Sequence, residues 1–114
     1  MSIAVEPRTL DLARHIRRGD RIVMGQACGE PTALVEALIE QGAAIGDLSA
    51  FIATSFSGLF TPDTASAFRL SSMGAIGALR SMTKANALDI VPVHVSQVGQ
   101  MIEAGHIGCD VAMI

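Results

Sequence analysis

A glycine-rich turn between a strand-like run and a helix-forming run constrains the fold of this chain most strongly. Arg21–Met24 is apolar and strand-like, residues 25–30 form the turn, and residues 31–41 favour a helix. Pro31 suits the first helical position because its missing N–H is not needed there, and Gly42 is expected to end the helix. The first amide groups of such a helix face the turn, where they favour an anion or a carbonyl oxygen.

The rest of the chain alternates between strand-like and helix-like segments. Only 4% of the residues are aromatic although half are hydrophobic, so the core must be mainly aliphatic. The alternation predicts an α/β fold with an open, mostly parallel sheet. A length of 114 residues allows one domain at most, so residues 1–114 are expected to form a single, partial domain. Further strands are expected at residues 48–54, 68–71, 90–95 and 111–114, and helices at 74–85, at 97–104 and after a cap at Thr9.

Loops rich in Gly, Ser or His follow most of these strands, at the edge where ligands bind to parallel sheets. The amides of Ala27, Cys28 and Gly29 would hold an acyl oxygen, a pantetheine amide or a carboxylate. Alternatively, the glycines serve only tight packing of the strand against the helix. The expected binding residues are Gly25, Gln26, Ala27, Cys28, Gly29, Glu30, Pro31, Ser71 and Ser72. Ser55, Ser57, Gly58 and Gly74 are either further binding residues or ordinary loop residues.

Two side chains of the turn have a possible catalytic role. Glu30 could attack a thioester as a nucleophile, or it could simply favour the helix start through the dipole. Cys28 could act as a nucleophile with His94, or it could fill a tight turn. Cys109 is expected to open a buried strand, whereas His15 and His106 are expected to face solvent.

Charge and composition argue against several other functions. The net charge is −3 and aromatic residues are scarce, which disfavours nucleic-acid binding. The three histidines and two cysteines lack metal-ligand spacing, so no metal site is expected. No permanently bound cofactor is expected either. No signal peptide and no membrane-spanning run is recognisable. We therefore expect a cytoplasmic protein with free thiols.

Several segments together resemble the N-terminal domain of the acetyl-CoA hydrolase/transferase family, with 4-hydroxybutyrate CoA-transferase as the nearest type. They are Gly-Asp-Arg-Ile-Val at 19–23, Gly-Gln-Ala-Cys-Gly-Glu-Pro at 25–31, Phe-Arg before Ser71 and Ser72, Val-Pro-Val-His-Val-Ser at 91–96 and Cys-Asp-Val-Ala at 109–112. The resemblance implies a CoA-transferase fold and transfer of coenzyme A between carboxylic acids through a glutamyl-CoA thioester. It assigns the nucleophilic glutamate to a second domain, so no catalytic residue is expected in this chain.

The resemblance also implies partners. Acyl-CoA and carboxylates would be the substrates, and a homo-oligomer or a complementary C-terminal domain or chain would complete the site. The chain stops within an apolar strand, which favours the front part of a longer polypeptide that is inactive alone. One alternative is a non-catalytic binding or assembly module that pairs with a separate chain. A further alternative is a domain resembling sugar-phosphate isomerases.

Overall fold

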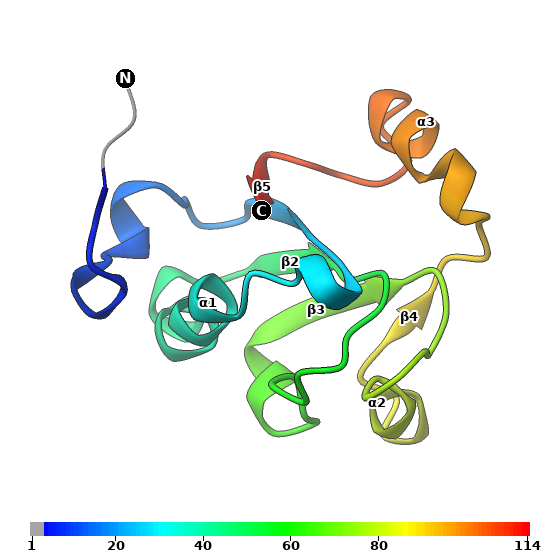
Figure 1. Cartoon of the computed structure of the whole chain (residues 1–114), viewed down its shortest axis with the longest axis horizontal. Helices are drawn as coiled ribbons and strands as arrows, with labels where there is room; N and C mark the ends of the chain where they lie inside the picture. The colour runs from blue at the N-terminus through cyan, green and yellow to red at the C-terminus, as the bar shows by residue number, and fades with distance from the viewer. Residues whose placement is uncertain (1–3) are drawn as a thin grey trace.

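The computed structural model describes residues 4–114, which fold around one five-stranded sheet (Figure 1). All neighbouring strands are parallel and their order is β4-β3-β2-β1-β5. The predicted α/β class with an open parallel sheet is therefore confirmed. The strands are β1 (Arg21–Met24), β2 (Leu48–Phe51), β3 (Phe68–Ser72), β4 (Asp89–Ile90) and β5 (Val111–Met113).

Helices cover the two faces of the sheet unequally. The longest, α1 (Thr32–Ile45), lies on the same side as α2 (Arg80–Lys84), while α3 (Val98–Glu103) lies on the opposite side (Figure 1). Short 3₁₀ turns supply the remaining helical structure. They span Pro7–Thr9, Leu12–Arg14, Ala27–Gly29, Thr64–Ala67 and Val95–Gln97.

Alternate strand residues build two hydrophobic clusters, one on each face. Ile22, Ala50 and Leu70 are paired across the sheet and belong to the larger cluster, which α1 and α2 cover. Phe51 points to the other face, where it packs with Ile107 and residues of α3 in the smaller cluster. Each face of the sheet therefore has its own hydrophobic cluster.

Gly42 does not end the first long helix, contrary to the sequence prediction. It is buried inside α1, which continues to Ile45 and ends at Gly46, where φ is +90°. A Cβ atom at Gly42 would overlap the ring of Phe68. The glycine is thus required by the close packing of α1 against β3 rather than by a helix terminus. The helix begins at Thr32, and Pro31 is its N-cap rather than its first residue.

Other predicted elements are shorter than expected or irregular. The predicted N-terminal helix is replaced by the two 3₁₀ turns, the second capped by Asp11, whose carboxylate accepts from the Ala13 amide at 3.2 Å. Residues 74–79 are not helical because Gly77 has φ +68° and pairs with Ser55 in an isolated parallel bridge. The predicted strand at 90–95 reduces to β4 at the sheet edge, and Pro92 follows it, as its missing donor requires. The predicted strand at 48–54 ends at Phe51.

An ion pair fixes the last strand to the first. Asp110 accepts from Arg21 Nε at 2.8 Å, from Nη2 at 2.9 Å and from the backbone amide of Arg21 at 2.9 Å. The Asp110 amide in turn donates to the Arg21 carbonyl at 2.7 Å. The hydrogen bonds from the Arg21 side chain, followed by the one from its amide, lower the pKa of Asp110 to about 2. This pair holds β5 in register beside β1.

Among residues 4–114, no helix is both long and apolar enough to cross a bilayer.

Candidate functional site

A carboxylate and two hydroxyl groups meet where β1 and β2 end. Glu30 Oε1 accepts from the Ser55 hydroxyl at 2.9 Å and from the Ser57 hydroxyl at 2.8 Å. Ser55 is only 1% exposed, whereas Glu30 is partly buried and Ser57 is exposed. The Glu30 carboxylate therefore lies at the protein surface, where one buried hydroxyl and one exposed hydroxyl donate hydrogen bonds to it. Within the described residues, Glu30 Oε2 has no partner and remains free to accept a hydrogen bond.

The turn of residues 25–31 is compact and most of its amides are already used. The Ala27 amide donates to the Thr54 carbonyl at 2.8 Å and the Gly29 amide to the Gln26 carbonyl at 2.8 Å. A Cβ atom at Gly25 would overlap the Gly29 carbonyl, so this glycine serves the turn itself. The Cys28 amide is the one member of the predicted trio without an acceptor in the described chain. The predicted anion cradle is thus reduced to a single available amide beside Glu30.

The predicted binding residues of the turn lie at the surface of the molecule. Gln26, Cys28 and Gly29 are exposed, and Gly25, Ala27, Glu30 and Pro31 are partly buried. Ala27 has φ +51°, a strained value for alanine, which turns the chain sharply after β1. These residues are therefore accessible to a ligand from the solvent.

The loop after β3 supports the loop after β2. The Ala78 amide donates to the Ser55 carbonyl at 2.9 Å, and Ser55 pairs with Gly77. A Cβ atom at Gly77 would overlap the same carbonyl and would lie 2.9 Å from Phe56 Cδ1. The Phe56 ring therefore rests on the bare backbone of Gly77, although the side chain is 65% exposed.

Ser71 and Ser72, which we expected to act together, face opposite sides of the sheet. Ser72 is buried, and its hydroxyl lies 3.0 Å from the Ala53 carbonyl and 2.8 Å from the Gly74 carbonyl. It therefore stabilises the loop after β3 from inside. Ser71 is partly exposed and lines a hollow on the face that α3 only partly covers.

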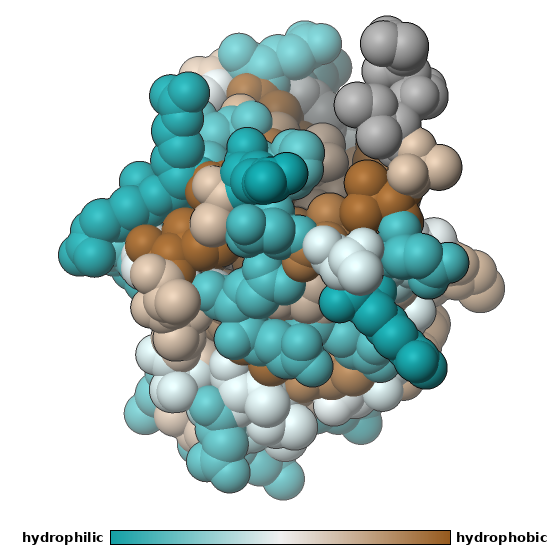
Figure 2. Space-filling model, turned by 90° about the vertical axis from the view of Figure 1, so that its left-hand side faces the viewer, coloured by the Kyte–Doolittle hydropathy of each residue, from teal (hydrophilic) through white to brown (hydrophobic). Residues whose placement is uncertain are grey.

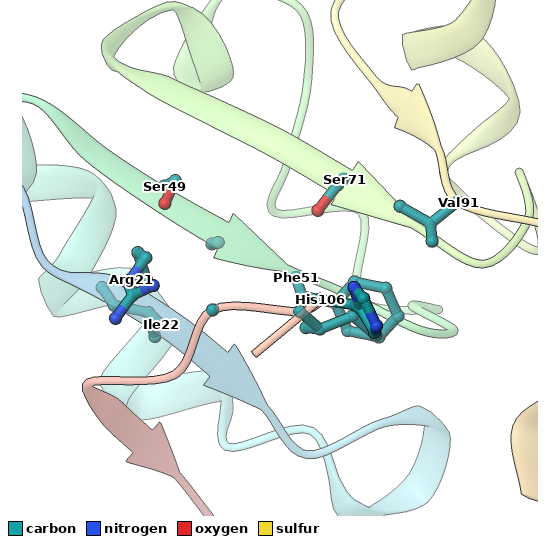
Figure 3. A pocket seen from close by; sticks show the side chains of 10 residues that line it. Arg21, Ile22, Ser49, Phe51, Ser71, Val91 and His106 are labelled. Carbon is teal, nitrogen blue, oxygen red and sulfur yellow. The ribbon is translucent and has the colours of Figure 1, made fainter. Parts of the chain in front are cut away.

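This hollow has a volume of about 100 Å³ and a polar lining (Figure 3). Figure 3 shows Ser49 and Ser71 on neighbouring strands, with His106 and Phe51 at one end and Arg21 at the other. The guanidinium of Arg21 is already paired with Asp110, so it is not free for an anion. The volume is below the range of pockets that hold cofactor-sized ligands. The hollow therefore suits water or a small polar group rather than coenzyme A.

A larger hollow of about 450 Å³ lies against the N-terminal turns and the start of α1. Its lining includes Val5, Leu10 and Leu34 together with Arg14 and His15. On the face formed by these turns and α1, hydrophobic residues occur as separate patches divided by hydrophilic ones (Figure 2). None of the predicted binding residues lines this hollow.

The other candidate nucleophiles and ligands are not assembled into a site. No hydrogen bond joins Cys28 to His94 in the described part of the chain, and both are exposed. Cys109 is also exposed, so the prediction that it opens a buried strand is wrong. His15 and His106 are exposed, as predicted. No group of three or more possible metal ligands occurs among residues 4–114.

Ser55 and Ser57 were expected to be binding or loop residues, but their contact with Glu30 was not expected, because Glu30 lies 25 positions before Ser55. Phe56 was missed altogether. The available signal was the Ser-Phe-Ser sequence directly after an apolar run, because such a run is expected to end at the edge where ligands bind to a parallel sheet.

The fold and sequence were compared with known proteins. A family model described as the acetyl-CoA hydrolase/transferase N-terminal domain matches residues 8–114. The structure is similar to RipA from Yersinia pestis, with a TM-score of 0.75 and 22% identity, covering 96% of this chain and 28% of RipA. Two single-residue variants of RipA each give a TM-score of 0.79 with 22% identity, covering 96% of this chain and 27% of theirs.

The chain thus spans little more than a quarter of the length of the RipA structures that it matches. At this identity the likeness shows a shared fold. A comparison with curated protein sequences gave no significant match.

Proposed function

The chain belongs to the acetyl-CoA hydrolase/transferase family, because residues 8–114 match the N-terminal domain of that family. We propose that it supplies the acyl-CoA-binding half of a CoA-transferase site. The reaction would move coenzyme A between carboxylic acids, with 4-hydroxybutyrate as the first acceptor to test. The observation that carries this proposal is the Glu30 carboxylate, bound to Ser55 and Ser57 at the carboxyl edge of a parallel sheet.

The groups left available at this edge match the chemistry of a pantetheine arm. A secondary amide donates through its N–H and accepts through its carbonyl oxygen. Glu30 Oε2 can accept from the N–H, and the Cys28 amide can donate to a carbonyl oxygen of the same arm. A hydrogen bond to an ionised carboxylate is stronger than one between neutral groups. Both partners belong to one short segment of the chain, so they can orient one ligand.

Glu30 is proposed as a binding residue rather than the nucleophile. Ser55 and Ser57 both donate to the same oxygen of this carboxylate and hold the side chain at the edge of the turn, so their hydrogen bonds position it to bind a ligand. The family resemblance assigns the reacting glutamate to a second domain. The chain alone would therefore bind a thioester without completing a turnover.

A complementary domain, a separate chain or a second copy would complete the site. Ile90 in β4 and Val95 after it are exposed apolar residues. Exposed apolar area of this kind favours association. We expect the chain to bind hydrophobic dyes or to self-associate until such a partner covers it.

Two measurements on the 114-residue chain test this proposal. Calorimetric titration with acetyl-CoA should show one-site binding, while incubation with acetyl-CoA and 4-hydroxybutyrate should yield no transferred CoA and no covalent protein thioester. Absence of binding at millimolar acetyl-CoA would overturn the proposed function and favour a purely assembling module. Turnover by the chain alone would overturn the requirement for a second domain.

A further inference from the structure

We propose that Phe56 contacts the aliphatic acyl chain of the thioester and sets the preference for acyl-chain length. This inference rests on the proposed function, because it assigns a specificity role to a residue at the same edge. Phe56 would bind the acyl portion of the ligand, whereas Glu30 and the Cys28 amide would bind its pantetheine arm.

The position of Phe56 is fixed by its neighbours in sequence. Ser55 and Ser57, on either side of it, both bind the Glu30 carboxylate. The Phe56 ring instead lies against Gly77, in the loop after β3. The carboxylate and the ring are therefore adjacent along the edge but do not compete for the same space.

The Phe56 ring lies against the backbone of Gly77, and much of its surface is exposed to solvent. It rests on Gly77, where a Cβ atom would lie 2.9 Å from Cδ1 and 3.0 Å from Cε1 of Phe56. Phe56 nevertheless stays 65% exposed, compared with 45% for Ile76 in the neighbouring loop. A large aromatic surface held in place yet uncovered has apolar area to gain from a ligand.

Ile76 extends this apolar surface. It is 45% exposed, and its side chain folds over Gly74, where a Cβ atom would lie 3.6 Å from Ile76 Cγ1. Phe56 and Ile76 thus flank Gly77 from two loops that the Ser55–Gly77 bridge joins. Both side chains are apolar and exposed. An unsubstituted acyl chain fits such a surface, whereas the amides of a pantetheine arm would lose hydrogen bonds to water there.

The chain-length dependence of binding tests this inference. Acetyl-CoA, butyryl-CoA and hexanoyl-CoA are titrated into the wild-type chain, Phe56→Ala, Phe56→Leu and the control Val95→Ala. Val95 is also an exposed apolar residue, at 54%, but it lies after β4. A methylene half-covered by the ring should raise affinity about twofold in the wild type. The gain should persist in Val95→Ala and partly in Phe56→Leu, and it should vanish in Phe56→Ala.

The possible outcomes separate the two proposals. Equal chain-length dependence in the wild type and in Phe56→Ala overturns the role of Phe56 while the proposed function stands. A failure of all three thioesters to bind the wild-type chain overturns both. Should Phe56→Ala fail to fold, as judged by its amide NMR spectrum, the comparison of Phe56→Leu with the wild type decides the matter. In that case, the inference is contradicted if the affinity gain per methylene in Phe56→Leu equals that of the wild type and the gain in Ile76→Ala is also unchanged.

Discussion

The carboxylate of Glu30 accepts a hydrogen bond from the hydroxyl of Ser55 at 2.9 Å, across 25 positions of sequence. This hydrogen bond joins the loops after β1 and β2, and the pairing of the buried Ser55 with Gly77 joins them to the loop after β3. In a parallel sheet these loops meet at one edge because all strands point the same way. The Glu30–Ser55 contact is therefore the structural basis of the proposed binding site.

Replacing Glu30 by Gln should weaken acetyl-CoA binding about tenfold or more, since a hydrogen bond to a charged acceptor contributes more than one to a neutral amide. The fold should persist, because the Gln carbonyl oxygen can still accept from Ser55 and Ser57. Calorimetry measures the affinity, and Glu36→Gln on the exposed side of α1 is the matched control. Equal loss of affinity in both variants would show that only net charge matters.

Replacing Gly42 by Ala should destabilise the fold by roughly 1–3 kcal/mol, because the added methyl group overlaps the Phe68 ring. The same change at Gly99 in α3, where a Cβ atom meets nothing within 4 Å, should stabilise the fold by up to about 1 kcal/mol. Urea unfolding measures both free energies. Stabilisation by both substitutions would mean that Phe68 moves aside easily.

Glycine substitutions also test the link between the loops after β2 and β3. Gly77 and Gly58 have nearly the same φ, +68° and +70°, but only Gly77 has close neighbours. Both alanine variants should carry a backbone strain of about 1 kcal/mol, while Gly77→Ala should lose more, because it also displaces the Ser55 carbonyl and Phe56. Thermal unfolding compares them, and equal losses would indicate that the loop adapts without cost.

The ion pair between Arg21 and Asp110 should make stability depend on pH in the acid range. The pKa of Asp110 is lowered to about 2 in the folded chain, against an ordinary value of 3.8. A lowered carboxyl pKa contributes stability above the ordinary value, and this contribution is lost as pH falls from about 4 towards 2. The stability difference between the wild type and Asp110→Asn should therefore be largest above pH 5 and shrink on acidification.

Urea midpoints at several pH values between 6 and 2.5 measure this difference. Asp63→Asn, which removes an exposed carboxylate without an ion pair in the described structure, is the control. A difference for Asp110→Asn that stays constant over this pH range would contradict the assignment.

The sequence was sufficient to predict the fold class, because apolar strands alternate with helices and glycines separate them. It was less informative where contacts between distant residues decide the structure. Gly42 has the sequence signature of a helix end, yet the Phe68 ring from another element explains its presence. Residues 74–79 have a helical period, but the pairing of Gly77 with Ser55 keeps them irregular.

The candidate site shows the same division. The turn at 25–31 and its exposure could be predicted from the strand–turn–helix pattern. The engagement of the Ala27 and Gly29 amides could not, since their acceptors depend on the exact path of the turn and of residue 54. The separation of Ser71 from Ser72 follows from the strand alternation once β3 is known to reach Ser72.

The most direct test of the proposed binding edge uses the two cysteines, both of which are exposed. Cys28 lies in the turn beside Glu30, whereas Cys109 lies before β5 and serves as an internal control. The rate of alkylation of each thiol by iodoacetamide, followed by mass spectrometry, is compared with and without saturating acetyl-CoA. Bound acetyl-CoA should slow the alkylation of Cys28 and leave that of Cys109 unchanged. Equal rates at Cys28 with and without a bound thioester would contradict it.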